Sequence, residues 1–125
     1  MIEFEQVEGI QTGTSLKGHI KASYAELVEC FGEPIYQGDR DGHHDKVWNE
    51  WVLEFKVPEE DEDDFDYVVA TIYDWKERGP FESREAVAYD WHIGGKDYRA
   101  TDCVEQVLEN YRMNLVDQQA EGILA

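Results

Sequence analysis

Three segments of the chain alternate between apolar and polar positions, a fourth is apolar on both faces, and both patterns are typical of β-strands. The segments are residues 14–22, 47–57, 65–75 and 87–95. The segment 65–75, FDYVVATIYDW, is apolar on both faces, which indicates a strand at the centre of a sheet. In the segment 47–57, Trp51, Leu53 and Phe55 share one face, which we expect to pack against the core.

A short helix is predicted over residues 24–31, because both of its ends carry sequence signals. Ser23 and Glu26 have the spacing of a capping box, in which each side chain bonds to the backbone of the other residue. Gly32 supplies the left-handed conformation that commonly ends a helix, and Pro34 prevents continuation.

A longer helix is predicted in the last quarter of the chain. Its apolar residues recur at helical spacing, and they are Val104, Val107, Leu108, Tyr111 and Leu115. Thr101 or Asp102 would cap the helix, and Glu105 would complete a capping box with Asp102. We expect the tail, residues 117–125, to fray or to pack loosely.

The order of these elements predicts an α+β fold. The chain reads strand, helix, three strands, helix, and the connections between the last three strands are too short for parallel crossovers. We therefore expect a single two-layer domain over residues 1–125, with an antiparallel sheet of about four strands and two helices on one face.

The net charge restricts the classes of partner. The chain has 29 acidic and 11 basic residues, with a formal net charge of −18. A field of this sign repels nucleic acids and anionic membranes and attracts cationic surfaces. We therefore expect no direct binding to nucleic acid or to a membrane.

Cysteine usage and hydropathy indicate a cytoplasmic protein. Cys30 and Cys103 lie far apart in the sequence and form no CxxC pair, so both are expected to be reduced thiols. The N-terminus is acidic and alternating, unlike a signal peptide. No apolar run approaches the ~20 residues that a membrane-spanning helix needs.

The acidic inter-strand loop 58–66 is the most unusual segment of the chain. Seven of the eight residues 59–66 are acidic. A calcium-binding EF-hand loop needs oxygen ligands at positions 1, 3, 5 and 12 and glycine at position 6. Starting at Asp61, position 5 is Phe65 and position 6 is Asp66, so the pattern fails. Two interpretations stay open: a solvated hairpin loop, or a docking surface for a cationic partner.

Other chemistry is poorly supported by the sequence. His43 and His44 are adjacent and lack a second pair of ligands at zinc spacing, while His19 and His92 fall on separate predicted strands. We find no nucleophile motif, phosphate-binding loop or dinucleotide fingerprint. We therefore expect no metal, no cofactor and no enzymatic activity.

Aromatic residues offer a second kind of interaction surface. Tyr67, Tyr73 and Trp75 share one face of the predicted central strand. Because the helices occupy one face of the sheet, some rings must lie on the opposite face. Trp48 opposes the packed face of its strand and is the best candidate for an exposed ring that anchors a partner.

Several motifs together resemble a group of small acidic proteins encoded by bacteriophages and mobile elements. The matching motifs are FGEP (31–34), IYDW (72–75) and WHIGG (91–95). The resemblance covers roughly residues 14–105. It implies no assigned chemistry and no functional residues that we could transfer.

These observations predict a non-enzymatic inhibitor of a host defence protein, of the CRISPR effector or restriction type. It would bind the basic surface of a nucleic-acid-binding protein through carboxylates that imitate phosphates. The expected binding residues are Asp39, Asp41, Asp45, Trp48, Glu59, Glu60, Asp61, Glu62, Asp63, Asp64 and Asp66. The alternatives are an interaction module that uses exposed aromatic rings without mimicry, and a small-molecule-binding accessory protein.

Overall fold

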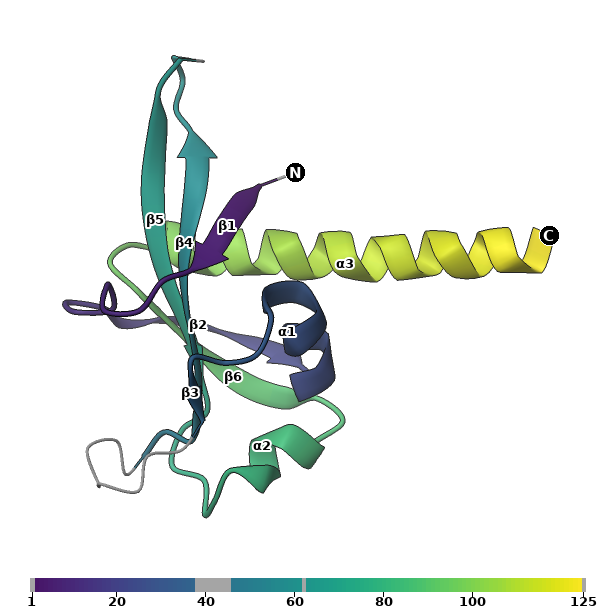
Figure 1. The fold of residues 1–125 in the computed structure, drawn as a ribbon, viewed down its shortest axis with the longest axis horizontal. Helices are drawn as coiled ribbons and strands as arrows, with labels where there is room; N and C mark the ends of the chain where they lie inside the picture. Colours follow the sequence, from purple (N-terminus) through teal and green to yellow (C-terminus); the bar gives the residue numbers. More distant parts are fainter. Residues whose placement is uncertain (1, 38–45, 62, 125) are drawn as a thin grey trace.

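The fold is α+β, as predicted, in a computed structural model that describes residues 2–37, 46–61 and 63–124. Figure 1 shows the sheet nearly edge-on, with α1 and α3 on one of its faces. The elements are β1 (Glu3–Gln6), β2 (Ser15–Ala22), α1 (Tyr24–Phe31), β3 (Tyr36–Gln37), β4 (Asn49–Pro58), β5 (Phe65–Tyr73), α2 (Phe81–Glu85), β6 (Tyr89–Gly95) and α3 (Arg99–Leu124).

The sheet is antiparallel throughout, with the strand order β1-β4-β5-β6-β2. The short strand β3 pairs with the start of β4. The segment predicted as the central strand is β5, which lies between β4 and β6. The strand β2 lies at the edge beside β6, which follows it by about seventy residues in the sequence, so the sheet depends on long-range pairing.

The core lies between the sheet and the two larger helices. The rings of Trp51 and Trp91 meet edge to face at a centroid distance of 5.3 Å, and both are fully buried. Each indole has a partner for its N–H group, because Trp51 donates to the Gly32 carbonyl oxygen and Trp91 to the Ala22 carbonyl oxygen. These bonds fasten the chain on either side of α1 to the sheet.

The predicted ends of α1 are confirmed. The side chain of Ser23 accepts a hydrogen bond from the backbone N–H of Glu26, and the Glu26 carboxylate accepts one from the N–H of Ser23. Gly32 ends the helix as predicted, but with φ at +87° and ψ at −174° its conformation is not the left-handed helical one that was expected. This φ lies in the region that glycine adopts without steric cost.

The predicted start of the last helix is wrong. The helix α3 begins at Arg99, before the expected cap at Thr101 or Asp102, and the backbone N–H of Arg99 donates to Asp97 Oδ1. The helix continues through the expected tail as far as Leu124. Asp97 therefore takes the place of the predicted cap.

A buried polar cluster joins α2 to the ends of β4 and β5. The carboxylate of Asp74 accepts hydrogen bonds from the Trp48 and Asn49 backbone N–H groups, from the Asn49 amide and from the Ser83 hydroxyl. Asn49, Asp74 and Ser83 are fully buried. Arg84 donates to Asn49 Oδ1 from the partly exposed side. We name these four side chains, Asn49, Asp74, Ser83 and Arg84, the Asp74 cluster.

Candidate interaction surfaces

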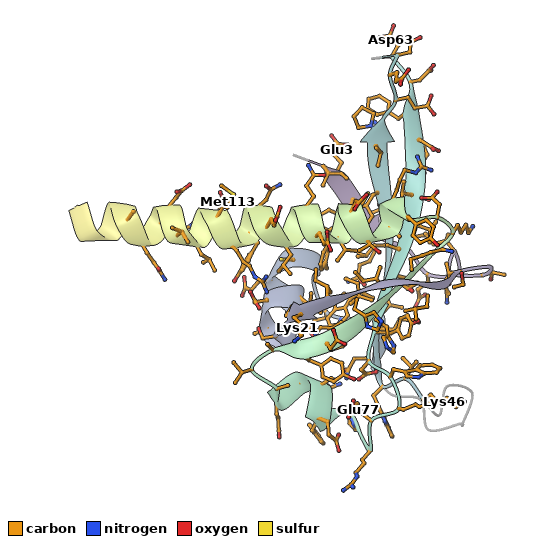
Figure 2. The ribbon with its side chains drawn as sticks, turned by 180° about the vertical axis from the view of Figure 1, so that it is seen from behind. Glu3, Lys21, Lys46, Asp63, Glu77 and Met113 are labelled. Atoms are coloured by element: carbon orange, nitrogen blue, oxygen red, sulfur yellow. The ribbon has the colours of Figure 1, made fainter. Side chains whose placement is uncertain are left out.

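The strands β4 and β5 extend well beyond the rest of the sheet and carry the acidic segment at their tip. Pairing continues as far as Pro58 and Phe65, and the Glu59 N–H donates to the Asp64 carbonyl oxygen across the turn. Figure 2 shows Asp63 at the outer end of this projection. We name residues 58–66 the acidic hairpin. The predicted inter-strand loop is therefore the end of a paired hairpin.

Most carboxylates of the acidic hairpin face water without a cationic partner. Five of them are exposed and form no ion pair with any residue that the structure describes, and these are Glu59, Glu60, Asp61, Asp63 and Asp64. The sixth expected residue, Glu62, lies outside the described residues. Clustered, unpaired charges of one sign repel one another, so the hairpin concentrates negative potential at its tip.

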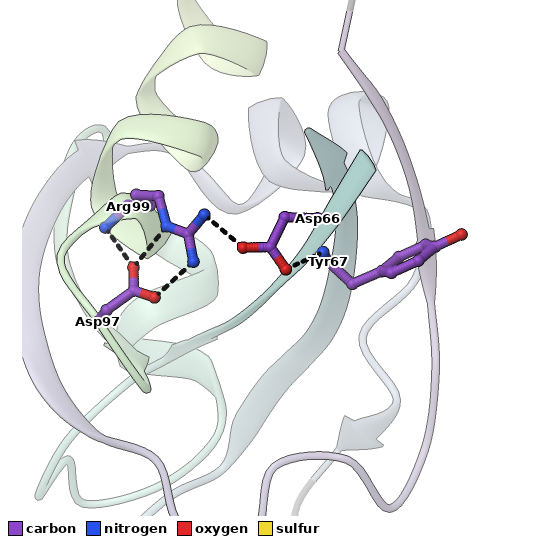
Figure 3. Close-up of polar contacts among 4 residues, drawn as sticks. All are labelled: Asp66, Tyr67, Asp97 and Arg99. Carbon is purple, nitrogen blue, oxygen red and sulfur yellow. Dashed lines mark hydrogen bonds and ion pairs between the residues drawn. The ribbon is translucent and has the colours of Figure 1, made fainter. Parts of the chain in front are cut away.

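Asp66 differs from the rest of the acidic hairpin, because it is paired within the chain. Its Oδ2 lies 2.7 Å from Arg99 Nη1, and the same guanidinium binds Asp97 at 2.9 Å (Figure 3). The hydrogen bond from Arg99 lowers the pKa values of Asp66 and Asp97. Asp66 therefore connects the base of the hairpin to the start of α3, where it is less available to a partner.

The acidic surface continues from the hairpin onto β1 and β4. Glu5 and Glu54 stand directly opposite each other in the ladder, where like charges are unfavourable. Glu3 is opposite Lys56, but Lys56 Nζ lies 4.1 Å from the centroid of the Phe65 ring and forms no ion pair within the described part of the chain. The three glutamates line a shallow depression on the face of the sheet that α1 and α3 leave uncovered. We name this face the open face.

Three of the expected acidic residues lie outside the described residues. These are Asp39, Asp41 and Asp45. The described residues on either side of them, Gln37 and Lys46, lie at the end of β4 that is opposite the acidic hairpin (Figure 2). Their part in binding stays a prediction.

Trp48 is not the exposed ring that the sequence predicted. It precedes β4, so strand alternation does not set its direction. The ring is half-buried, and its indole N–H donates to the Glu77 carbonyl oxygen at 3.0 Å. Trp48 therefore holds the loop after β5 in place. The exposed indole on the open face belongs to Trp75, with an exposed fraction of 38%.

Four rings gather on the open face at the end away from the acidic hairpin. Tyr73, His92 and His19 stand side by side on β5, β6 and β2, because Tyr73 pairs with His92 and His92 with His19. The ring centroids are 5.4 Å apart for Tyr73 and His92 and 4.6 Å apart for the two histidines, and Trp75 lies 5.9 Å from His92. We name Tyr73, Trp75, His19 and His92 the ring cluster.

Burial and neighbouring charges perturb the groups around the ring cluster. Burial, and then the nearby His19, lower the pKa of His92. Glu50 is opposite Tyr73 on β4, and burial together with the charge of Asp74 raises its pKa to about 7. The Lys46 and Lys76 ammonium groups lie 5.7 and 5.8 Å from the Trp75 ring centroid. The open face is thus acidic near the hairpin and carries cationic groups near the ring cluster.

The described residues provide little for metal or thiol chemistry. They contain no group of three or more histidine, cysteine and acidic side chains that could hold a metal ion. Burial raises the pKa of Cys30 to about 11 and also raises that of Cys103, so both thiols stay protonated at neutral pH. Among the helices described, none has the length and apolar character needed to cross a bilayer.

Comparisons with protein-family models, curated proteins and solved structures found no match to this chain. The resemblance to phage and mobile-element proteins therefore stays an expectation from the sequence. The two surfaces described above are the basis for a functional proposal.

Proposed function

We propose that this protein is a non-enzymatic inhibitor that binds the basic surface of a host nucleic-acid-binding defence protein, of the CRISPR effector or restriction type. The observation that carries the proposal is the tip of the acidic hairpin. Five exposed carboxylates lie there with no cationic partner in the described part of the chain. Such an arrangement costs stability through repulsion, and a cationic partner would relieve that cost.

The shape of the hairpin supports docking into a groove. The tip projects past the sheet on two paired strands, so its carboxylates are presented away from the other elements (Figure 2). Grooves that hold nucleic acid are lined with lysine and arginine. Carboxylates that occupy them displace counterions as phosphates do, which makes the affinity fall with salt.

The test measures affinity for a purified defence effector between about 50 and 500 mM salt, with and without its nucleic acid. The hairpin variant replaces Glu59, Glu60, Asp61, Asp63 and Asp64 by the corresponding amides. The control removes the same number of charges elsewhere, at Glu85, Asp102, Glu105, Glu109 and Asp117, which are all exposed. We expect the hairpin variant to lose binding and the control to retain most of it. Salt-independent binding, or equal losses in both variants, would contradict phosphate mimicry.

The ring cluster favours a second candidate, an interaction module without mimicry. The observation that supports this candidate is the exposed indole of Trp75, which lies beside Tyr73 and His92. Aromatic anchors of this kind often contribute most of the energy of an interface. In this case Trp75→Ala would abolish binding, whereas the hairpin variant would bind like the wild type at all salt concentrations.

A further inference from the structure

The helix α3 continues far beyond the elements on which it packs. Its last fully buried residue is Leu108, and every described side chain from Met113 to Ala120 is exposed. Figure 1 shows this part of the helix running clear of the sheet and of α1 toward the C-terminus. At 1.5 Å per residue, the twelve residues from Met113 to Leu124 span about 18 Å. We name residues 113–124 the α3 extension.

One face of α3 is acidic where the helix packs on the sheet and apolar where the helix extends beyond it. Positions 102, 105, 109, 113, 116 and 120 are separated by three or four residues, so they share one face of the helix. The first three are Asp102, Glu105 and Glu109, and the last three are Met113, Val116 and Ala120. The exposed fractions of Met113 and Val116 are 65% and 63%. We name the last three residues the apolar stripe.

A partner packed on the apolar stripe would stabilise the α3 extension. The α3 extension continues a helix that is already formed on the sheet, so it needs no new nucleation, but most helical stability in proteins comes from packing of an apolar face. The α3 extension has no such packing in the described part of the chain. The α3 extension contains two charged side chains, Asp117 and Glu121, and neither belongs to the apolar stripe, in a protein of net charge −18. This is therefore a surface on which another acidic molecule would meet little repulsion.

We propose that the apolar stripe packs against the same stripe of a second copy of this chain, with the two helices antiparallel. A second copy fits because the stripe is apolar, nearly free of charge and able to oppose itself about a two-fold axis. Charge selects the antiparallel arrangement. Parallel helices would set Glu105 and Glu109 of both copies side by side, whereas antiparallel helices send the two acidic bodies to opposite ends.

The spacing of the stripe fixes an approximate register. An axis near residue 118 places Val116 of one copy against Ala120 of the other, so a larger side chain meets a smaller one. In this register the acidic residues on the same face of α3, such as Glu109, lie beyond the end of the opposing helix. The contact is small, so we expect a dimer that dissociates on dilution.

The mass of the intact chain in solution tests the proposal. We expect sedimentation or light scattering to show twice the monomer mass of 14.6 kDa as the concentration rises from about 10 to 500 µM. Met113→Glu with Val116→Glu should shift the dissociation constant at least tenfold toward the monomer. Glutamate is a good helix former, so the variant keeps the helix while its stripe becomes charged. Circular dichroism at low concentration would verify that the fold is retained.

A matched control adds the same charges to the opposite side of the α3 extension. Asn114→Glu with Gln118→Glu places two carboxylates one turn apart, away from the apolar stripe. We expect the dissociation constant of this variant's dimer to lie within threefold of the wild-type value. A wild type that stays monomeric at all concentrations would overturn the proposal. So would equal effects of the two double variants, or a heterologous partner that binds the stripe of a monomeric chain.

The orientation has its own measurement. A spin label at Glu105→Cys, with both native cysteines replaced by alanine, reports the distance between the two copies. An axis near residue 118 predicts about 39 Å along the helices for antiparallel pairing, and parallel pairing predicts about 10 Å. A short distance would overturn the antiparallel arrangement.

Salt separates this proposal from the proposed function. Screening weakens repulsion between two acidic bodies, so the dimer should become tighter as salt rises, whereas docking of the acidic hairpin should become weaker. The dimer therefore stands or fails independently of the partner.

Discussion

Asp74 is the residue on which the sheet and α2 depend most directly. Its buried carboxylate is the shared acceptor for the backbone at Trp48 and for the side chains of Asn49 and Ser83. Asp74→Ala would remove the acceptor of the buried Asn49 backbone N–H and of the Ser83 hydroxyl, while the Asn49 amide would keep the Pro80 carbonyl oxygen and Ser83 Oγ as acceptors. We expect it to lower the free energy of unfolding by about 3 kcal/mol or more, measured by urea denaturation.

Two further variants distinguish the loss of buried hydrogen bonds from the loss of a carboxylate charge as the cause of the lower stability. Ser83→Ala removes one donor of the Asp74 cluster, and we expect a loss of about 1 kcal/mol. Asp90→Ala removes an exposed carboxylate from β6 and should change stability by less than about 0.5 kcal/mol. If Asp74→Ala proved as mild as Asp90→Ala, the cluster would not be a structural requirement.

Glu50 makes the stability of the fold depend on pH. Burial raises its pKa from the ordinary 4.5 to about 7, so between these values the folded chain binds a proton that the unfolded chain has released. Stability from this group is therefore greatest below about pH 4.5 and is lost as the pH rises to about 7. Glu50→Gln does not titrate, so it should become more stable than the wild type over this range, by up to about 3 kcal/mol.

Urea denaturation of both proteins between about pH 4.5 and 8 would measure this difference. A constant difference across the range would contradict a titrating Glu50. A difference of the opposite sign, with the wild type gaining stability as the pH rises, would indicate a favourable charge partner in place of burial.

At the scale of elements, Gly95 sets how closely α3 approaches β6. A β-carbon at this position would collide with the β-carbon of Ala100 and would lie 3.2 Å from the Val69 carbonyl oxygen. Neither neighbour is the flexible end of a side chain. We expect Gly95→Ala to lower the free energy of unfolding by about 1 to 3 kcal/mol, measured by thermal or urea unfolding.

A glycine outside the sheet provides the control. At Gly79 the nearest atom to an added β-carbon is Glu82 Oε2, at an ordinary 3.6 Å. Gly79→Ala should therefore be nearly neutral. Equal effects at the two positions would indicate that backbone freedom, rather than close packing, decides the cost at Gly95.

The elements that the sequence predicted are those with local signals. The helix α1 has a capping box and a terminal glycine, and the predicted strands have apolar residues in alternation or, for β5, on both faces. The missed elements depend on distant partners: β1 and β3 are short and form by pairing with β4, and α2 has no side-chain cap. The start of α3 was misplaced because Asp97, and not a residue of the predicted box, accepts the first N–H.

The parts of the candidate surfaces that have a local sequence signal were predicted, and the parts that depend on distant partners were not. The sequence shows a run of acidic residues between two strands. It also shows more aromatic residues than the helix-covered face of the sheet can hold. The contact between His19 and His92 requires the pairing of β2 with β6, which no local pattern specifies. The exposure of Trp75 in place of Trp48 depends on a carbonyl oxygen, that of Glu77, in a loop without periodicity.

Across the whole molecule, the three surfaces differ in charge and direction. The acidic hairpin and the ring cluster lie toward opposite ends of the open face, and the apolar stripe lies on a helix that leaves the opposite side of the sheet (Figures 1 and 2). A partner on the hairpin and a second copy on the α3 extension would therefore not compete. We expect the double variant Met113→Glu, Val116→Glu to bind the hairpin's partner with unchanged intrinsic affinity, which calorimetry of both proteins would check.

The net charge of −18 also predicts how salt acts on the fold itself. The ion pairs of the described residues involve side chains that are mostly about half exposed, such as Arg99 and Asp66, so screening them costs little. Screening of the repulsion among the remaining acids should dominate, because the Debye length falls below about 5 Å near 0.5 M salt. We therefore expect the melting temperature to rise between about 50 and 500 mM sodium chloride.

The hairpin variant locates the source of this effect. Neutralising its five unpaired carboxylates removes the densest group of like charges, so the rise in melting temperature with salt should be smaller than in the wild type. The control with five neutralised acids outside the hairpin, four of them on α3, has the same net charge and should keep a larger part of the rise. If the two variants responded alike, net charge alone would govern the response to salt. The acidic hairpin would then carry no concentrated repulsion for a cationic partner to relieve.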